Sequence, residues 1–154
     1  MDKLGWLIGG VLVAAIAVFA WQSTQPNEPA RGTMVRPDLG ALNALQDGDP
    51  IVEVRLPAEL SPEATMGQRA FEASCAACHG INAAGQNGVA PPLIHQTYAP
   101  DHHGDMSFIL APENGVQSHH WPFGNMPRIE GLTRADLRTI VAYIRALQVE
   151  NGIN

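Results

Sequence analysis

Cysteine is scarce in this chain: only 2 of its 154 residues are cysteines, Cys75 and Cys78, and they stand close together. A zinc site usually takes four ligands, often from two such pairs, and no second cysteine pair exists here. A disulfide between the two would close a very small loop and would constrain the unfolded chain little. No strand–helix–strand pattern surrounds them, as a thioredoxin-like dithiol would require. Zinc binding and dithiol chemistry stay as alternatives for this pair, each with part of its usual pattern missing.

Basic residues and aromatic residues are also few. The chain has 9 Lys and Arg against 15 Asp and Glu, a net charge of −6, so nucleic acid is not an expected partner. Aromatic residues make up 6% of the sequence, which fits a small domain whose core is completed by a bound cofactor. The length suits one ordinary domain rather than two large ones, and there is no internal repeat.

The two cysteines belong to the stretch Cys75-Ala76-Ala77-Cys78-His79, whose C-x-x-C-H spacing is typical of covalent c-type haem attachment. The two thiols add to the two vinyl groups of one porphyrin, and the intervening residues set a suitable separation. The histidine that follows lies under the ring and offers an imidazole nitrogen to the iron. The motif therefore predicts one covalently bound haem c, held by Cys75, Cys78 and His79.

Amphipathic helices are predicted on both sides of this motif. Ser61-Pro62-Glu63 combines a capping residue, a proline suited to the first turn and an acidic residue at the positive end of the dipole. It predicts a helix that runs to about Ser74. Thr133, with Asp136 three residues later, predicts the start of a last helix with a capping box. The apolar stripe of this last helix consists of Leu137, Ile140, Val141, Ile144 and Leu147.

Over residues 61–148 the chain resembles the class I monohaem c-type cytochromes. In that family the first helix crosses the last one, with a small residue at the crossing and an aromatic residue beside it, and Gly67 and Phe71 match this pattern. The resemblance implies an all-α cytochrome c fold that carries one haem c and transfers electrons. We interpret the chain as a membrane-anchored bacterial member of this family.

The resemblance also assigns a residue behind the histidine ligand. In the family a proline carbonyl accepts the Nδ1–H of that histidine, which fixes the ring tautomer and raises its basicity. Within Ala90-Pro91-Pro92-Leu93 the expected residue is Pro91, with Pro92 as the alternative. A plain proline-rich turn is the other interpretation. Leu93 is then expected to press on the haem face.

The second axial ligand is expected in Trp121-Pro122-Phe123-Gly124-Asn125-Met126-Pro127, which is similar to the distal loop of the family, where a methionine before a proline reaches the iron. A thioether is a soft, neutral ligand that favours ferrous iron and raises the reduction potential. Met126 is therefore the predicted ligand, ahead of Met106, which stands in a predicted helix. The indole N–H of Trp121 either reaches a haem propionate or the ring serves in packing alone.

Histidines are concentrated in the segment after the haem motif. Outside that motif the chain has five of its 6 histidines: His95, His102, His103, His119 and His120. Such a density of imidazoles suits a copper or zinc ion, or an alternative iron ligand. The other interpretation makes them surface residues and neighbours of the haem propionates. A short helix is expected between the two adjacent pairs, over residues 106–111, with Asp105 as its cap.

An almost unbroken apolar run extends from Leu4 to Trp21. As a helix it would measure about 27 Å, close to the thickness of a bilayer's hydrocarbon core. A tryptophan near each end suits the membrane–water interface, and Lys3 favours a cytoplasmic N-terminus. We expect an uncleaved transmembrane anchor over residues 1–21, with a signal peptide cleaved after Ala20 as the alternative.

The remaining chain is expected to divide in two. Residues 22–60 are predicted to be a linker and an irregular segment, because prolines and polar residues come first and the β-branched residues 51–56 have no partner strand. Residues 61–154 are predicted to form the cytochrome c domain. Both interpretations of the N-terminus export this domain, so we expect it in the periplasm, attached to a bacterial inner membrane by a single span.

The predicted function is one-electron transfer, with the haem iron cycling between its ferric and ferrous states. Redox proteins at the inner membrane, such as respiratory complexes, are the expected partners, and neither an enzymatic activity nor a small-molecule substrate is expected. A peroxidase would need an open iron site, which a Met126 ligand closes. The alternatives are a permanent haem c subunit of an oxidase or dehydrogenase, and a metal-binding or sensory haem protein that uses the histidines.

Overall fold

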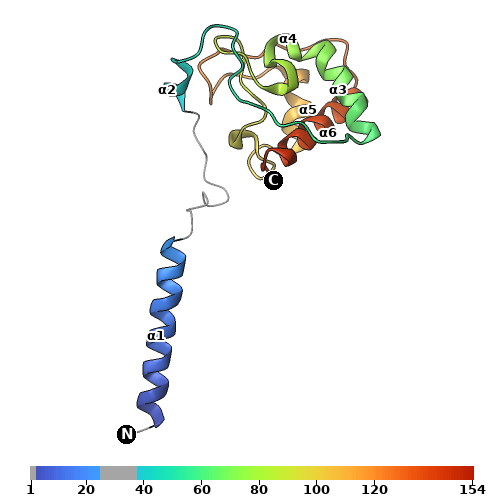
Figure 1. The fold of residues 1–154 in the computed structure, drawn as a ribbon. Helices are drawn as coiled ribbons and strands as arrows, with labels where there is room; N and C mark the ends of the chain where they lie inside the picture. The colour runs from blue at the N-terminus through green and yellow to red at the C-terminus, as the bar shows by residue number, and fades with distance from the viewer. Residues whose placement is uncertain (1–2, 25–37) are drawn as a thin grey trace. The chain divides into compact units, whose positions relative to one another are not determined.

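The structure, a computed structural model, describes residues 3–24 and 38–154. The chain forms two compact units, Met1–Thr33 and Met34–Asn154. The first contains helix α1, and the second contains the haem motif and every element from α2 to α6 (Figure 1). The part of the predicted linker that covers residues 25–37 lies outside the described residues.

Helix α1 spans Lys3–Thr24. Among the residues that the structure describes, no helix is long and apolar enough to cross a membrane. This finding overturns the predicted transmembrane anchor over residues 1–21, and with it the single-pass inner-membrane location with a periplasmic haem domain. A membrane span needs about 20 consecutive apolar residues.

The second unit is mostly helical, as the sequence predicts. Its α-helices are α2 (Leu39–Leu42), α3 (Pro62–Ser74), α4 (Ala76–His79), α5 (Asp105–Asn114) and α6 (Arg134–Glu150), and the 3-10 turns η1 and η2 cover Ile81–Ala83 and Gln96–Tyr98. The described residues contain no β-strand beyond two isolated bridges, Gln86 with Ala90 and Val116 with Met126. The site is therefore built from helices and the loops between them.

Helices α3 and α6 begin where the sequence predicts. Ser61 Oγ accepts a hydrogen bond of 3.1 Å from the backbone N–H of Ala64, and Pro62 is the first residue of α3. At the start of α6, Thr133 Oγ1 accepts from the N–H of Asp136 at 3.2 Å, and the Asp136 carboxylate accepts from the N–H of Thr133 at 2.9 Å. These bonds satisfy N–H groups that the first turn of a helix leaves without partners.

Helix α5 differs from the prediction in length and in its cap. It covers Asp105–Asn114 rather than residues 106–111, and its N-cap is Gly104 rather than Asp105. The carboxylate of Asp105 instead accepts a hydrogen bond of 2.9 Å from Arg145 Nε. The Asp105 side chain therefore pairs with α6 and does not cap α5.

The core of the unit lies where α3 and α6 cross, the most extensive contact between two of its helices (Figure 1). Phe71 of α3 and Tyr143 of α6 are fully buried there, with their ring centroids 5.7 Å apart. Gly67 lies at the crossing, directly against the backbone of Thr139. The small residue and the aromatic residue that the family resemblance places at this crossing are confirmed.

The segment before α3 packs along the second unit without forming a strand. Val52 is partly buried against the core. The side-chain amide of Asn87 donates to the Leu42 carbonyl at 3.2 Å, and the N–H of Arg55 donates to Asn151 Oδ1 at 2.9 Å. Side-chain amides from distant parts of the sequence thus provide hydrogen-bond partners for the backbone groups of this irregular segment.

Candidate functional site

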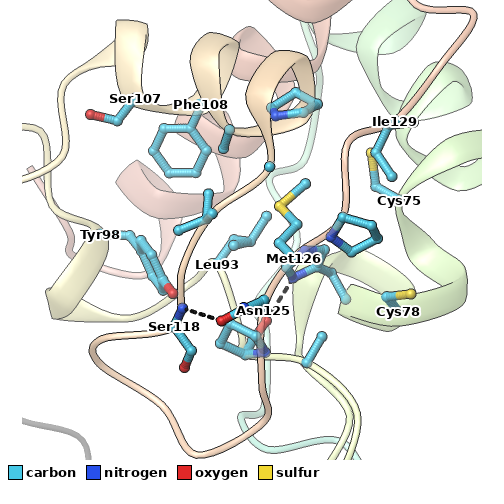
Figure 2. Close-up of a pocket in the computed structure, with 18 of the residues that line it drawn as sticks. Cys75, Cys78, Leu93, Tyr98, Ser107, Phe108, Ser118, Asn125, Met126 and Ile129 are labelled. Carbon is cyan, nitrogen blue, oxygen red and sulfur yellow. Dashed lines mark hydrogen bonds between the residues drawn. The ribbon is translucent and has the colours of Figure 1, made fainter.

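A cavity of about 500 Å³ lies between the helices and the loop that precedes α6. Pockets that enclose a small molecule or a cofactor are typically about 300–1,000 Å³. Apolar side chains form much of its wall, among them Phe71, Phe108, Leu137, Ile140 and Ile144. Figure 2 shows Cys75 and Cys78 on the helical segment formed by α3 and α4, and Met126 on the loop that precedes α6. The structure brings all the predicted site residues to this cavity: Cys75, Cys78, His79, Pro91, Leu93, Trp121 and Met126.

The two cysteines reach the cavity from a single helical turn. Cys75 ends α3 and precedes α4, so the chain changes direction there and Cys78 follows within α4. Cys75 is half-buried, Cys78 is exposed, and both are free thiols. Burial, and to a lesser degree the neighbouring Cys78, raises the pKa of Cys75 to about 11. Two thiols at one wall of one cavity is the arrangement that attachment to a single porphyrin requires.

His79 is buried at the end of α4, and its Nδ1 lies 2.9 Å from the carbonyl oxygen of Pro91. When Nδ1–H donates to this carbonyl, Nε2 carries the lone pair that can bind a metal. Burial lowers the pKa of His79 below its usual value of 6.5, although the hydrogen bond to the Pro91 carbonyl acts in the opposite direction. The imidazole is therefore neutral at pH 7. The hydrogen bond selects Pro91 over Pro92, which is itself fully buried. Leu93, two residues after Pro91, also lines the cavity.

Met126 lines the cavity from a loop whose base is closed by backbone hydrogen bonds. The N–H of Met126 donates to the Val116 carbonyl at 2.9 Å, and the N–H of Val116 donates to the Met126 carbonyl at 2.9 Å. Inside the loop the N–H of Ser118 donates to Asn125 Oδ1 at 2.9 Å (Figure 2). Met106, in contrast, is 52% exposed on α5 and does not line the cavity. Only one of these two methionines is therefore placed to reach a group in the cavity.

Trp121 is buried in the cavity wall, where its ring lies 5.9 Å from that of Phe123 and 5.2 Å from that of His95. Its Nε1 is buried and has no hydrogen-bond partner among the described residues. Burial raises the pKa of Tyr98, and the nearby indole of Trp121 opposes this rise without reaching hydrogen-bond geometry. A buried N–H without a partner costs free energy. This donor therefore suits an acceptor that a cofactor brings, such as a propionate.

Sequence reasoning missed Tyr98 and Phe108, which line the cavity from η2 and α5. Their ring centroids lie 6.1 Å apart, and the Arg145 guanidinium lies 4.9 Å from the centroid of Phe108. Neither residue belongs to a short motif. The available signal was composition, because four of the chain's nine aromatic residues stand between the haem motif and the last helix.

Comparison with known families agrees with this geometry. The family model for cytochrome c matches residues 64–148, more than half of the chain, and the chain therefore belongs to the cytochrome c family. The match supports a class I c-type cytochrome. Among curated proteins, none matches the chain significantly.

The residues present fit the cofactor of this family, a covalently attached haem c. Two thiols, a neutral imidazole nitrogen, a buried indole N–H without a partner and an apolar wall all meet at one cavity. Cys75, Cys78 and His79 fit one haem, so the predicted cofactor is confirmed. Members of the family are typically electron carriers, and haem-based electron transfer follows as the general function of this domain.

Proposed function

We propose that the protein is a one-electron carrier in which His79 and Met126 are the axial ligands of a single haem c. The observation that carries this proposal is that both side chains line one cavity, although they come from separate segments of the chain. His79 ends α4, whereas Met126 stands at the closed base of a loop more than forty residues later.

The two ligands differ in chemistry. Bound haem supplies the one-electron couple of its iron. His79 offers a nitrogen whose basicity the Pro91 carbonyl raises, and Met126 offers a soft, neutral sulfur that favours the reduced metal. The apolar cavity wall limits access of water, which further disfavours the more highly charged oxidised state. We therefore expect a reduction potential well above that of a haem with two histidine ligands.

The same ligands argue against catalysis. If His79 and Met126 both bound the iron, no coordination position would be left for a small molecule, whereas a peroxidase needs one. The two backbone hydrogen bonds between Val116 and Met126 hold the methionine at its place. We infer an electron carrier without an enzymatic activity and without a small-molecule substrate.

Other redox proteins, including respiratory or related electron-transfer complexes, are the proposed partners. Cys78 and Val89 line the cavity and are also exposed, Val89 to 44%, so this part of the wall reaches the surface. Ile81, close by in sequence, is 76% exposed. Exposed apolar residues at the opening of a cofactor cavity suit brief docking of another protein. The net charge of −6 favours a partner with a positively charged surface.

A redox titration of the full-length holoprotein, followed by its optical spectrum, tests the proposed function. We expect one reversible one-electron transition. Met126→Ala should lower the midpoint potential by more than about 60 mV, a tenfold change in the ferric-to-ferrous preference. Met106→Ala is the matched control and should leave the potential unchanged, since Met106 does not line the cavity. An unchanged potential in Met126→Ala would contradict the proposed ligand pair.

A further inference from the structure

Four histidines from two loops meet at the haem cavity, and three of them, His103, His119 and His120, line its wall. His102 and His103 follow η2, and His119 and His120 lie in the loop that ends at Met126, all outside helices. The ring centroids of His102 and His103 are 4.5 Å apart, and those of His119 and His120 are 4.1 Å apart. The two pairs also meet each other, since His103 and His120 have their ring centroids at 5.2 Å. The fold thus gathers imidazoles that the sequence separates.

We propose that His102, His103 and His120 bind one divalent transition-metal ion of borderline softness, Cu(II) or Zn(II), distinct from the haem iron. Each ring offers one nitrogen, and these nitrogens all lie within 4.8 Å of one another. Nitrogens that share a tetrahedral ion at about 2.0–2.1 Å stand about 3.4 Å apart. Small rotations of the side chains therefore complete the geometry. His119, whose ring lies next to that of His120, can supply a fourth ligand.

Hydrogen bonds to backbone carbonyls already orient two of the four rings. His103 Nδ1 lies 2.7 Å from the carbonyl oxygen of Thr97, and His119 Nδ1 lies 2.8 Å from that of Gln117. An Nδ1–H that donates to a carbonyl leaves the lone pair on Nε2. Imidazoles that bind metals usually donate their second N–H in this way, which fixes both the tautomer and the direction of the ring.

Both loops are held in place by hydrogen bonds. Arg145 of α6 donates to the carbonyl of Tyr98 at 3.0 Å and to the carbonyl of His103 at 2.5 Å. In the other loop, the Ser118 hydroxyl donates to the carbonyl of Trp121 at 2.5 Å. Ligands on restrained segments lose little conformational entropy when a metal binds. A bound ion would also tie the Met126 loop to residues 102–103, because His120 belongs to that loop.

The donor set selects the kind of ion. It contains imidazole nitrogens and no carboxylate, whereas Mg²⁺ and Ca²⁺ require oxygen ligands.

Titration of the full-length holoprotein with Cu(II) or Zn(II) against a competing chelator tests this site. We expect one ion per chain, with no competition from Mg²⁺. His102→Gln replaces an exposed side chain and should weaken binding at least about tenfold, and the triple variant at His102, His103 and His120 at least about 100-fold. His95→Asn is the matched control. It changes a histidine outside the cluster, preserves an acceptor for the Thr97 N–H, and should leave the affinity unchanged.

Electron paramagnetic resonance of the Cu(II) form provides a second readout, since imidazole nitrogens bound to copper should produce couplings that His102→Gln reduces. Undiminished binding in the triple variant, or an equal loss in His95→Asn, would overturn the proposal. A changed haem spectrum in His102→Gln without added metal would also overturn it, because the histidine would then act on the haem iron.

Discussion

A Cβ atom added at Gly67 would stand 1.8 Å from the carbonyl oxygen of Thr139. Helices α3 and α6 therefore cross at a distance that only glycine permits. The crossing sets the positions of Phe71 and Ile140, which line the haem cavity from the two helices. Gly67 thus permits the close crossing of the two helices that carry these lining residues.

Replacing Gly67 by Ala should destabilise the protein by more than about 3 kcal/mol, because the clash is with backbone and no side-chain rotation relieves it. Thermal unfolding followed by circular dichroism measures this loss. Gly104→Ala is the control, since a Cβ there would have its nearest atom, Pro100 O, at 4.0 Å. Its cost should stay below about 1 kcal/mol. Equal losses in the two variants would argue against the close crossing.

Covalent attachment predicts that haem stays on the polypeptide after denaturation in acid and detergent. Mass spectrometry of the intact protein should show one haem added to the chain. Serine at both Cys75 and Cys78 should leave little holoprotein, because no thiol then remains to form a thioether. Haem that extracts freely from the wild-type protein into organic solvent would refute the attachment.

Trp121→Phe should lower the reduction potential while haem attachment is preserved. The buried Nε1 has no partner among the described residues, and we expect it to donate to a haem propionate. Without this donor the negative charge of the propionate is less well compensated, which favours ferric iron. Phe123→Leu changes the neighbouring ring and removes no donor, so it should leave the potential unchanged. No shift in Trp121→Phe would make Trp121 a packing residue only.

The capping box of α6 predicts a dependence of stability on pH. Hydrogen bonds from the Thr133 hydroxyl and N–H lower the pKa of Asp136 below its usual value of 3.8. The stability gained is complete above that usual value and is lost as the pH falls through the lowered value. The difference in unfolding free energy between wild type and Asp136→Asn should therefore shrink as the pH falls below the usual value of 3.8. A difference that stays constant over this range would contradict the role of the carboxylate.

Local patterns carried most of the successful predictions. The spacing of Cys75, Cys78 and His79 specifies its chemistry within five residues, and the caps at Ser61 and Thr133 act within one helical turn. The apolar run that ends at Trp21 predicted a membrane span, and the described residues do not bear it out. The apolar run does form a helix, α1. Apolar composition thus indicated the helix correctly, but it was a weaker guide to whether the helix lies in a membrane.

The remaining features depend on contacts between distant residues. Asp105 does not cap its helix because Arg145, forty residues later, binds its carboxylate. Tyr98 and Phe108 meet at the cavity through the packing of η2 and α5, which no short pattern encodes. The approach of His102 to His120 likewise results from the placement of two loops. Such contacts could be identified only once the fold was known.

Carbon monoxide binding to the ferrous holoprotein tests the central claim, ligation of the iron by His79 and Met126, most directly. The wild-type protein should bind carbon monoxide poorly, because the gas must displace a thioether whose loop is closed at Val116. Met126→Ala should bind it readily, and Met106→Ala should behave like the wild type. Ready binding by the wild-type protein, equal to that of Met126→Ala, would show an open iron site and would contradict the account.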